Sequence, residues 1–304
     1  MIILNLQSPL PPPPLPATRV IAFTTPKNYA GRLSHLMHSK GWTPLWCPTV
    51  IVESTPQTIS SIQRCLLLKN GQISSLQEFS AIAFTSRTGI TAFSEALDKI
   101  KTPPLAAHGE AFILSALGKD SELLDESFIN KLCENPDRIS VLVPPVATPT
   151  ALVESIGLGQ GKKVLCPVPL VIGLEEPPVV PKFLADLARK GWVPIRLNAY
   201  ETRWAGRESV TQLVRKSEEE GGLDAIVFTS TGEVEGLLKS LEELGLNWGM
   251  VRQRCPRMVV AAHGPVTAAG AETLGVGIDV VSSRFDSFIG VVDALAYRFK
   301  SFDS

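Results

Sequence analysis

The stretch AIVFTS at residues 225–230 repeats, with a single substitution, the stretch AIAFTS at residues 81–86. Each stretch begins with the apolar residues typical of a buried parallel strand and ends with hydroxyl-bearing residues that suit the start of a helix. Apolar residues then recur at intervals of three and four, the spacing that gives a helix one apolar face. The order strand, hydroxyl-rich turn, helix therefore occurs twice in this chain.

Matching segments also lie outside these two stretches. The segment KGWTP at residues 40–44 is similar to KGWVP at residues 190–194, and each ends a predicted helix. Each also leads into a long extended run, at 42–52 and at 195–204. Strands that alternate with helices over short turns predict parallel sheets with helices on both faces.

The two extended runs decide how the domains are expected to connect. A length of 304 residues favours two domains, and each run is too long for one small sheet, so we expect both to cross between domains. We therefore predict an α/β fold in which two parallel-sheet domains, with helices on both faces, are joined by a two-stranded β ladder that acts as a hinge. The predicted parts are a flexible Pro-rich arm at 1–17, a first α/β domain at 18–50 plus 201–304, and a second α/β domain at 51–200.

The composition excludes several classes of protein. A net charge of −1 argues against a general nucleic-acid binder, which needs a basic excess. No apolar run reaches the roughly 20 residues of a membrane-spanning helix, and the apolar start of the chain lacks the basic residues of a signal peptide. Five cysteines without a CxxC pair and four scattered histidines predict free, mostly buried thiols of a reducing compartment and no metal site.

Four turns are candidates for ligand binding because each follows a predicted strand. They lie at 24–26, 86–89, 230–232 and 264–267 and consist mainly of serine, threonine and glycine. Ligands of open parallel sheets bind beyond the carboxyl ends of the strands, where helix N-termini offer free N–H groups to carboxylates or phosphates. Capping of the following helix explains the same residue types, and the two interpretations are compatible.

Tyr200 lies in the second extended run, where a crossing strand would place it beside the cleft between the domains. A tyrosine there can pack as an amphipathic filler, or it can donate a proton into the cleft. The sequence contains no phosphate-binding glycine loop after a strand, no Walker lysine loop, no GxSxG elbow and no HExxH segment.

Several of these segments together resemble the uroporphyrinogen-III synthase family. They are the paired FTS turns, the segment AYET at 199–202, and the segment AAHGPVTAA at 261–269 followed by LGV at 274–276. The resemblance extends in order and spacing from about Val20 to Leu295. The segments at 27–32 and 144–157 are similar to the form found in oxygenic phototrophs.

The resemblance implies a lyase that works without a cofactor, in heme and chlorophyll biosynthesis. Enzymes of this family take the linear tetrapyrrole hydroxymethylbilane, expel its ring A hydroxyl as water, invert ring D and close the macrocycle. The resemblance also implies two α/β domains joined by a ladder, and we expect a monomer that binds a small molecule and neither nucleic acid nor membrane. The expected location is the chloroplast stroma if the chain comes from a plant, and otherwise the cytoplasm.

The resemblance also gives roles to individual residues. Tyr200 matches the family's cleft tyrosine and is expected to donate the proton to the leaving hydroxyl. Arg87 is a candidate counter-ion, and turn residues are expected to hold the acetate and propionate groups of the substrate. The candidate substrate-binding residues are Thr24, Ser86, Arg87, Ser121, Ser230, Thr231, Gly264 and Thr267.

The chain departs from the family pattern at two places. Thr25 stands where many bacterial members have arginine, and the segment GKDS at 118–121 is more acidic than the usual pattern. Because of these departures, an alternative remains: the chain is a non-catalytic paralogue that has the same fold and binds a tetrapyrrole or a protein partner. A hinge protein of the periplasmic-binding type is a third possibility, against which the lack of an export signal counts.

Overall fold

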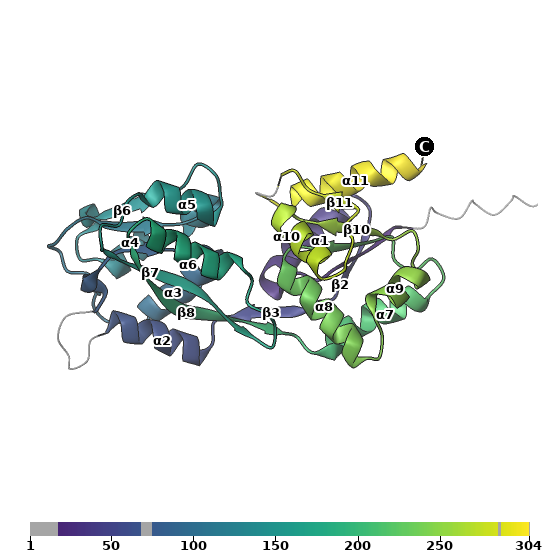
Figure 1. The fold of residues 1–304 in the computed structure, drawn as a ribbon, viewed down its shortest axis with the longest axis horizontal. Coiled ribbons are helices and arrows are strands. Elements are labelled where there is room, and N and C mark those ends of the chain that lie inside the picture. The colour runs from purple at the N-terminus through teal and green to yellow at the C-terminus, as the bar shows by residue number, and fades with distance from the viewer. Residues whose placement is uncertain (1–17, 68–74, 285–286, 304) are drawn as a thin grey trace, which may run out of the picture.

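The computed structural model describes residues 18–67, 75–284 and 287–303, so the predicted arm at 1–17 lies outside the described residues. The strands form two separate sheets, each in its own lobe (Figure 1). The lobes are connected through β3 (Val50–Glu53) and the long strand β8 (Val193–Trp204), as Figure 1 shows. The two-lobed α/β fold expected from the repeats is confirmed.

The first lobe has a parallel sheet in the order β11-β10-β9-β1-β2. Its inner strands are almost completely buried because helices cover both faces. The strands are β1 (Val20–Phe23), β2 (Thr43–Trp46), β9 (Ala225–Phe228), β10 (Val259–Ala262) and β11 (Val280–Val281). One face packs on α7 (Thr211–Glu218), α8 (Thr231–Glu243), α9 (Trp248–Arg254) and α10 (Pro265–Thr273). The other face packs on α1 (Lys27–His38) and α11 (Ile289–Asp303).

The second lobe has a sheet in the order β3-β8-β7-β4-β5-β6. Its further strands are β4 (Phe79–Ala83), β5 (Phe112–Ser115), β6 (Ile139–Leu142) and β7 (Lys163–Ile172). One face packs on α2 (Pro56–Leu66), α3 (Arg87–Leu97) and α4 (Glu126–Leu132), and the other on α5 (Pro149–Ile156) and α6 (Val179–Arg189). The short 3₁₀ helices are Ser75–Glu78, Gly118–Leu123 and Pro136–Arg138 in this lobe and Arg207–Val210 in the first. This sheet is parallel except at its edge, where β3 runs antiparallel to β8.

The first extended run changes sheets between β2 and β3, and Thr49 holds this crossing against α8. The Thr49 hydroxyl donates to the Glu233 carbonyl oxygen at 2.7 Å, and the Ala205 N–H donates to the Thr49 carbonyl oxygen at 3.0 Å. A Cβ atom on Gly236 of α8 would lie 2.6 Å from that carbonyl oxygen, so only glycine permits this close approach. The second run stays in β8 up to Trp204 before the chain enters the first lobe. The domain boundaries near residues 50 and 200 stay a prediction.

The cysteines and the lengths of the helices bear on two expectations from the composition. The five cysteines are all free thiols, and four of them are buried. Within the described ranges, no helix is both long enough and apolar enough to cross a membrane.

Candidate active site

The buried phenol of Tyr200 lies at the N-terminus of α3. Its side chain belongs to the core beneath α2 and α3 and is only 6% exposed. The Ser86 hydroxyl donates to the Tyr200 hydroxyl at 2.9 Å and also accepts the N–H of Gly89 at 3.1 Å. Ser86 is therefore both the N-cap of α3 and the hydrogen-bond partner of the phenol.

The environment of Tyr200 keeps its phenol protonated near neutral pH. The pKa of Tyr200 is raised to about 12, mainly by burial; the hydrogen bond from Ser86 lowers it, and the nearby Tyr29 and Asp120 raise it. A protonated phenol can donate a proton but cannot accept one at its oxygen as a base would. The phenol therefore carries a proton that a general acid would donate.

Tyr29 reaches this turn from the other lobe. It lies in the first turn of α1, where its ring packs edge-on against Phe288 with centroids 6.2 Å apart. Burial raises the pKa of Tyr29, and the nearby Thr88 side chain acts in the opposite direction. We use the name interlobe cluster for the side chains that meet here: Tyr29, Ser86, Arg87, Thr88, Asp120 and Tyr200.

Tyr29 is a residue of this cluster that was not among the candidates predicted from the sequence. A signal was present, because Tyr29 follows the turn at 24–26, which ends the first strand. Residues in the first turn after a parallel strand lie at the edge of the sheet where ligands bind.

Arg87 and Asp120 form the charged part of the interlobe cluster. The Arg87 guanidinium lies 3.9 Å from a carboxylate oxygen of Asp120, and the Arg87 side chain is 45% exposed. Burial raises the pKa of Asp120 although Arg87 acts in the opposite direction. Arg87 thus remains accessible to a second carboxylate.

Ser121 lies in a 3₁₀ helix, unlike its counterpart Thr267. The spacing Gly118-x-x-Ser121 in the sequence matches Gly264-x-x-Thr267. Residues 118–123 nevertheless form a 3₁₀ turn that begins at Gly118 with a φ of +48°, whereas Gly264 is the N-cap of the α-helix α10. The Ser121 hydroxyl donates to the Gly118 carbonyl oxygen at 2.7 Å, and the Thr267 hydroxyl donates to the Thr229 carbonyl oxygen at 3.2 Å. The two pseudo-equivalent turns therefore present different backbone donors.

Glu233 occupies the corresponding turn of the first lobe. Its carboxylate is buried at the start of α8 and accepts the Thr24 hydroxyl at 2.8 Å, the Thr229 N–H at 2.9 Å, and the hydroxyls of Thr229 and Ser230. Burial raises the pKa of Glu233 in spite of these donors. The candidate residues Thr24 and Ser230 are thus bonded to a carboxylate of the protein itself.

The sequence analysis also missed Glu233. The available signal was the spacing Ser230-x-x-Glu233, which is that of a capping box. Nothing in that spacing shows that the carboxylate is buried beneath strands β1 and β9.

The remaining candidates lie at the start of α8 and α10. The Thr231 side chain packs directly against Gly270 of α10. Any side chain at residue 270 would collide with Thr231. Gly264 is the N-cap of α10 and leaves the first turn of that helix without a side-chain cap. Unpaired N–H groups of this kind favour a bound anion.

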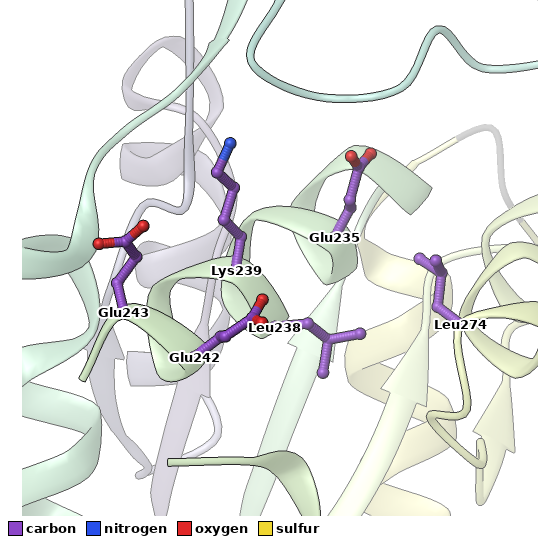
Figure 2. A pocket seen from close by; sticks show the side chains of 6 residues that line it. All are labelled: Glu235, Leu238, Lys239, Glu242, Glu243 and Leu274. Atoms are coloured by element: carbon purple, nitrogen blue, oxygen red, sulfur yellow. The ribbon is translucent and has the colours of Figure 1, made fainter. Parts of the chain in front are cut away.

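A surface hollow of about 690 Å³ lies beside α8 (Figure 2), and Tyr200 is not among its lining residues. Figure 2 shows its lining side chains, which are Glu235, Leu238, Lys239, Glu242, Glu243 and Leu274. The Lys239 ammonium group donates to the Gly173 carbonyl oxygen at 2.9 Å and lies over the Trp204 ring. Three carboxylates around an ammonium group that is already engaged would repel a polyanion, so this hollow does not suit a ligand rich in carboxylates.

The described residues contain no group of three or more side chains arranged to hold a metal ion. His263 packs against the ring of Phe288 with centroids 5.0 Å apart. His263 and Tyr29 thus both pack against the ring of Phe288.

The fold and site define a class: two-lobed α/β proteins in which a buried phenol meets helix N-termini at the junction of the lobes. The sequence model described as Uroporphyrinogen-III synthase HemD matches residues 31–288. This chain belongs to the uroporphyrinogen-III synthase family, as the resemblance indicated.

A solved structure of a family member shows the same fold. A mutant uroporphyrinogen III synthase from the extremely thermophilic bacterium Thermus thermophilus superposes with a TM-score of 0.55 at 18% identity and covers 94% of this chain and 100% of its own. The wild-type Thermus enzyme, in another crystal form, gives a TM-score of 0.45 at 17% identity with the same coverage. The comparison with curated proteins gave no match.

Proposed function

We propose that this protein is a uroporphyrinogen-III synthase, which cyclises hydroxymethylbilane to uroporphyrinogen III with loss of water and inversion of ring D. Membership of the family supports this activity. The observation that carries it is the buried Tyr200 phenol, which is held by Ser86 where the two lobes meet.

Tyr200 is the proposed general acid. The ring A hydroxyl must leave as water, so it needs a proton as its C–O bond breaks. Tyr200 supplies that proton, and the Ser86 hydroxyl stabilises the phenolate that forms by donating to its oxygen. A positioned acid of this kind contributes about 10²- to 10⁴-fold to a rate.

Binding energy for the substrate would come from its carboxylates. Arg87 and the first turn of α10 at Gly264 offer accessible positive charge and N–H groups. The full proposed binding set remains Thr24, Ser86, Arg87, Ser121, Ser230, Thr231, Gly264 and Thr267. Holding the flexible substrate in a reactive geometry supplies much of the remaining acceleration.

We further propose a monomer that needs no cofactor. It would act in the chloroplast stroma if the source is a plant and in the cytoplasm otherwise, and its product would serve heme and, in a phototroph, chlorophyll biosynthesis.

A non-catalytic paralogue on this fold is the second candidate. Two acidic groups favour it, because Asp120 lies beside Arg87 and the Glu233 carboxylate lies under the first-lobe turn. Both would reduce the attraction for a substrate with many carboxylates.

Product isomer analysis separates the two candidates. Purified protein incubated with hydroxymethylbilane is expected to form type III porphyrinogen faster than the spontaneous cyclisation that gives type I. Type I alone, at the spontaneous rate, excludes the synthase. Thermal stabilisation by uroporphyrin without type III product supports the paralogue.

A further inference from the structure

The turns that precede α3 and α8 each contain an N-cap serine, and the hydroxyls of these two serines have different partners. Ser230 begins α8, and the carboxylate of Glu233, three residues on, lies 3.3 Å from its hydroxyl. Ser86 begins α3, but the residue three positions on is Gly89, which has no side chain. At this turn the Ser86 hydroxyl donates instead to the Tyr200 hydroxyl, at 2.9 Å.

The space beside Gly89 is limited. A Cβ atom on Gly89 would lie 3.3 Å from the Ser86 hydroxyl oxygen, 3.4 Å from the Pro167 carbonyl oxygen and 3.7 Å from Cε1 of Tyr200. The distances to the β7 backbone and to Tyr200 are those of ordinary contact, so the Ser86 hydroxyl, which is the hydrogen-bond partner of Tyr200, is the group that must shift, by a few tenths of an ångström. Gly89 is not among the glycines with positive φ, so its conformation does not itself demand glycine.

We propose that Gly89 is a positioning residue: the absence of a side chain at the third position of α3 reserves the Ser86 hydroxyl for Tyr200. The proposal rests on the proposed function, because Tyr200 needs this position only if it delivers a proton. A carboxylate at residue 89 would accept the hydrogen bond of the Ser86 hydroxyl, as the Glu233 carboxylate accepts that of Ser230. Glycine at this place thus distinguishes the catalytic turn from the first-lobe turn.

A merely structural role for Gly89 makes a different prediction. Glycine is a poor helix former, so an alanine in the first turn should favour α3. If Gly89 acted only on folding, Gly89→Ala would leave turnover unchanged. A positioning role instead predicts slower turnover without loss of thermal stability.

The test uses Gly89→Ala and Gly89→Glu in the full chain, with Gly31→Ala as the control. Gly31 lies in α1, and nothing comes within 4 Å of an added Cβ, so it reports the effect of glycine replacement alone. The measurements are kcat, KM, thermal stability and the NMR signals of ring-¹³C-labelled tyrosine. The chain has three tyrosines, so the Tyr200 signal can be assigned with Tyr200→Phe.

We expect kcat to fall about 5-fold for Gly89→Ala, with KM within about 2-fold, and by about 10- to 100-fold for Gly89→Glu, as for loss of the phenol itself. The Tyr200 Cζ signal should move in both variants. In Gly31→Ala, kcat, KM and the Tyr200 signal should be unchanged, and thermal stability should be equal to or higher than that of the wild type. An unmoved Tyr200 signal in Gly89→Glu overturns the proposal, as does a wild-type kcat in that variant. A wild-type protein without synthase activity refutes the proposed function, whereas the Tyr200 signal still tests the placement of the phenol.

Discussion

The Ser86 hydroxyl donates to the Tyr200 hydroxyl at 2.9 Å, although the two residues are 114 positions apart in the sequence. The same Ser86 oxygen accepts the N–H of Gly89 and so caps α3. One side chain therefore links the stability of a helix terminus to the orientation of the proposed acid.

Replacement of Ser86 should affect both properties. Ser86→Ala removes the N-cap and the phenol's partner, so the free energy of unfolding should fall by about 1 kcal/mol and kcat by about 10-fold. Urea unfolding and steady-state kinetics measure the two effects. Asn247→Ala, which removes the N-cap of the distant helix α9, should destabilise comparably without lowering kcat. Equal kinetic losses in both variants would contradict a specific link to Tyr200.

Tyr29 is expected to contribute mainly to substrate binding. Tyr29→Phe keeps the packing on Phe288 but removes the hydroxyl that interacts with Thr88 across the lobes. The loss of this polar contact between the lobes predicts a rise in KM of about 5-fold with a smaller change in kcat. A kcat loss as large as that of Tyr200→Phe, with KM unchanged, would give Tyr29 a chemical role instead.

Glu233 should make stability depend on pH in a definite direction. Its folded-state pKa is raised above the unfolded value near 4.5, so its contribution is fully present below that value and is lost as pH rises through the folded pKa. Glu233→Gln removes this dependence. Urea unfolding from about pH 4 to about pH 8 should show wild type losing stability relative to Glu233→Gln as pH increases. A relative stability that rises with pH would show that the donors around the carboxylate outweigh its burial.

Gly236 should be intolerant of any side chain. Gly236→Ala places a Cβ atom 2.6 Å from the Thr49 carbonyl oxygen, which is backbone, so we expect a loss of about 1 to 3 kcal/mol in the free energy of unfolding. Gly232→Ala in the same helix meets no atom within 4 Å and should be neutral or stabilising by up to about 1 kcal/mol. Chemical denaturation of both variants measures the difference, and equal stabilities would mean that the crossing at Thr49 can relax.

Much of this fold could be predicted from the repeated FTS turns, because the end of a strand and the start of a helix depend on residues that are close in the sequence. A strand that ends in a hydroxyl-bearing N-cap needs only neighbouring residues to be recognised, and both α3 and α8 begin where the turns indicated. The resemblance to the family likewise depends on short segments in order, and the family is confirmed.

The remaining features depend on contacts between distant parts of the chain. Tyr29 meets Thr88 only because the lobes come together, and Glu233 is buried only because β1 and β9 are neighbours in the sheet. The 3₁₀ turn at Gly118 was paired with Gly264 by sequence spacing, and spacing alone does not distinguish it from the start of an α-helix. Such features follow from tertiary packing, which overrides local pattern.

The rate of type III porphyrinogen formation by wild type and by Tyr200→Phe, measured on the same substrate preparation, tests the role of the buried phenol most directly. If Tyr200 is the proton donor, wild type forms the type III isomer above the spontaneous background, and Tyr200→Phe forms it about 10- to 100-fold more slowly with similar substrate affinity. A Tyr200→Phe variant that forms type III product at the wild-type rate would show that the phenol only packs.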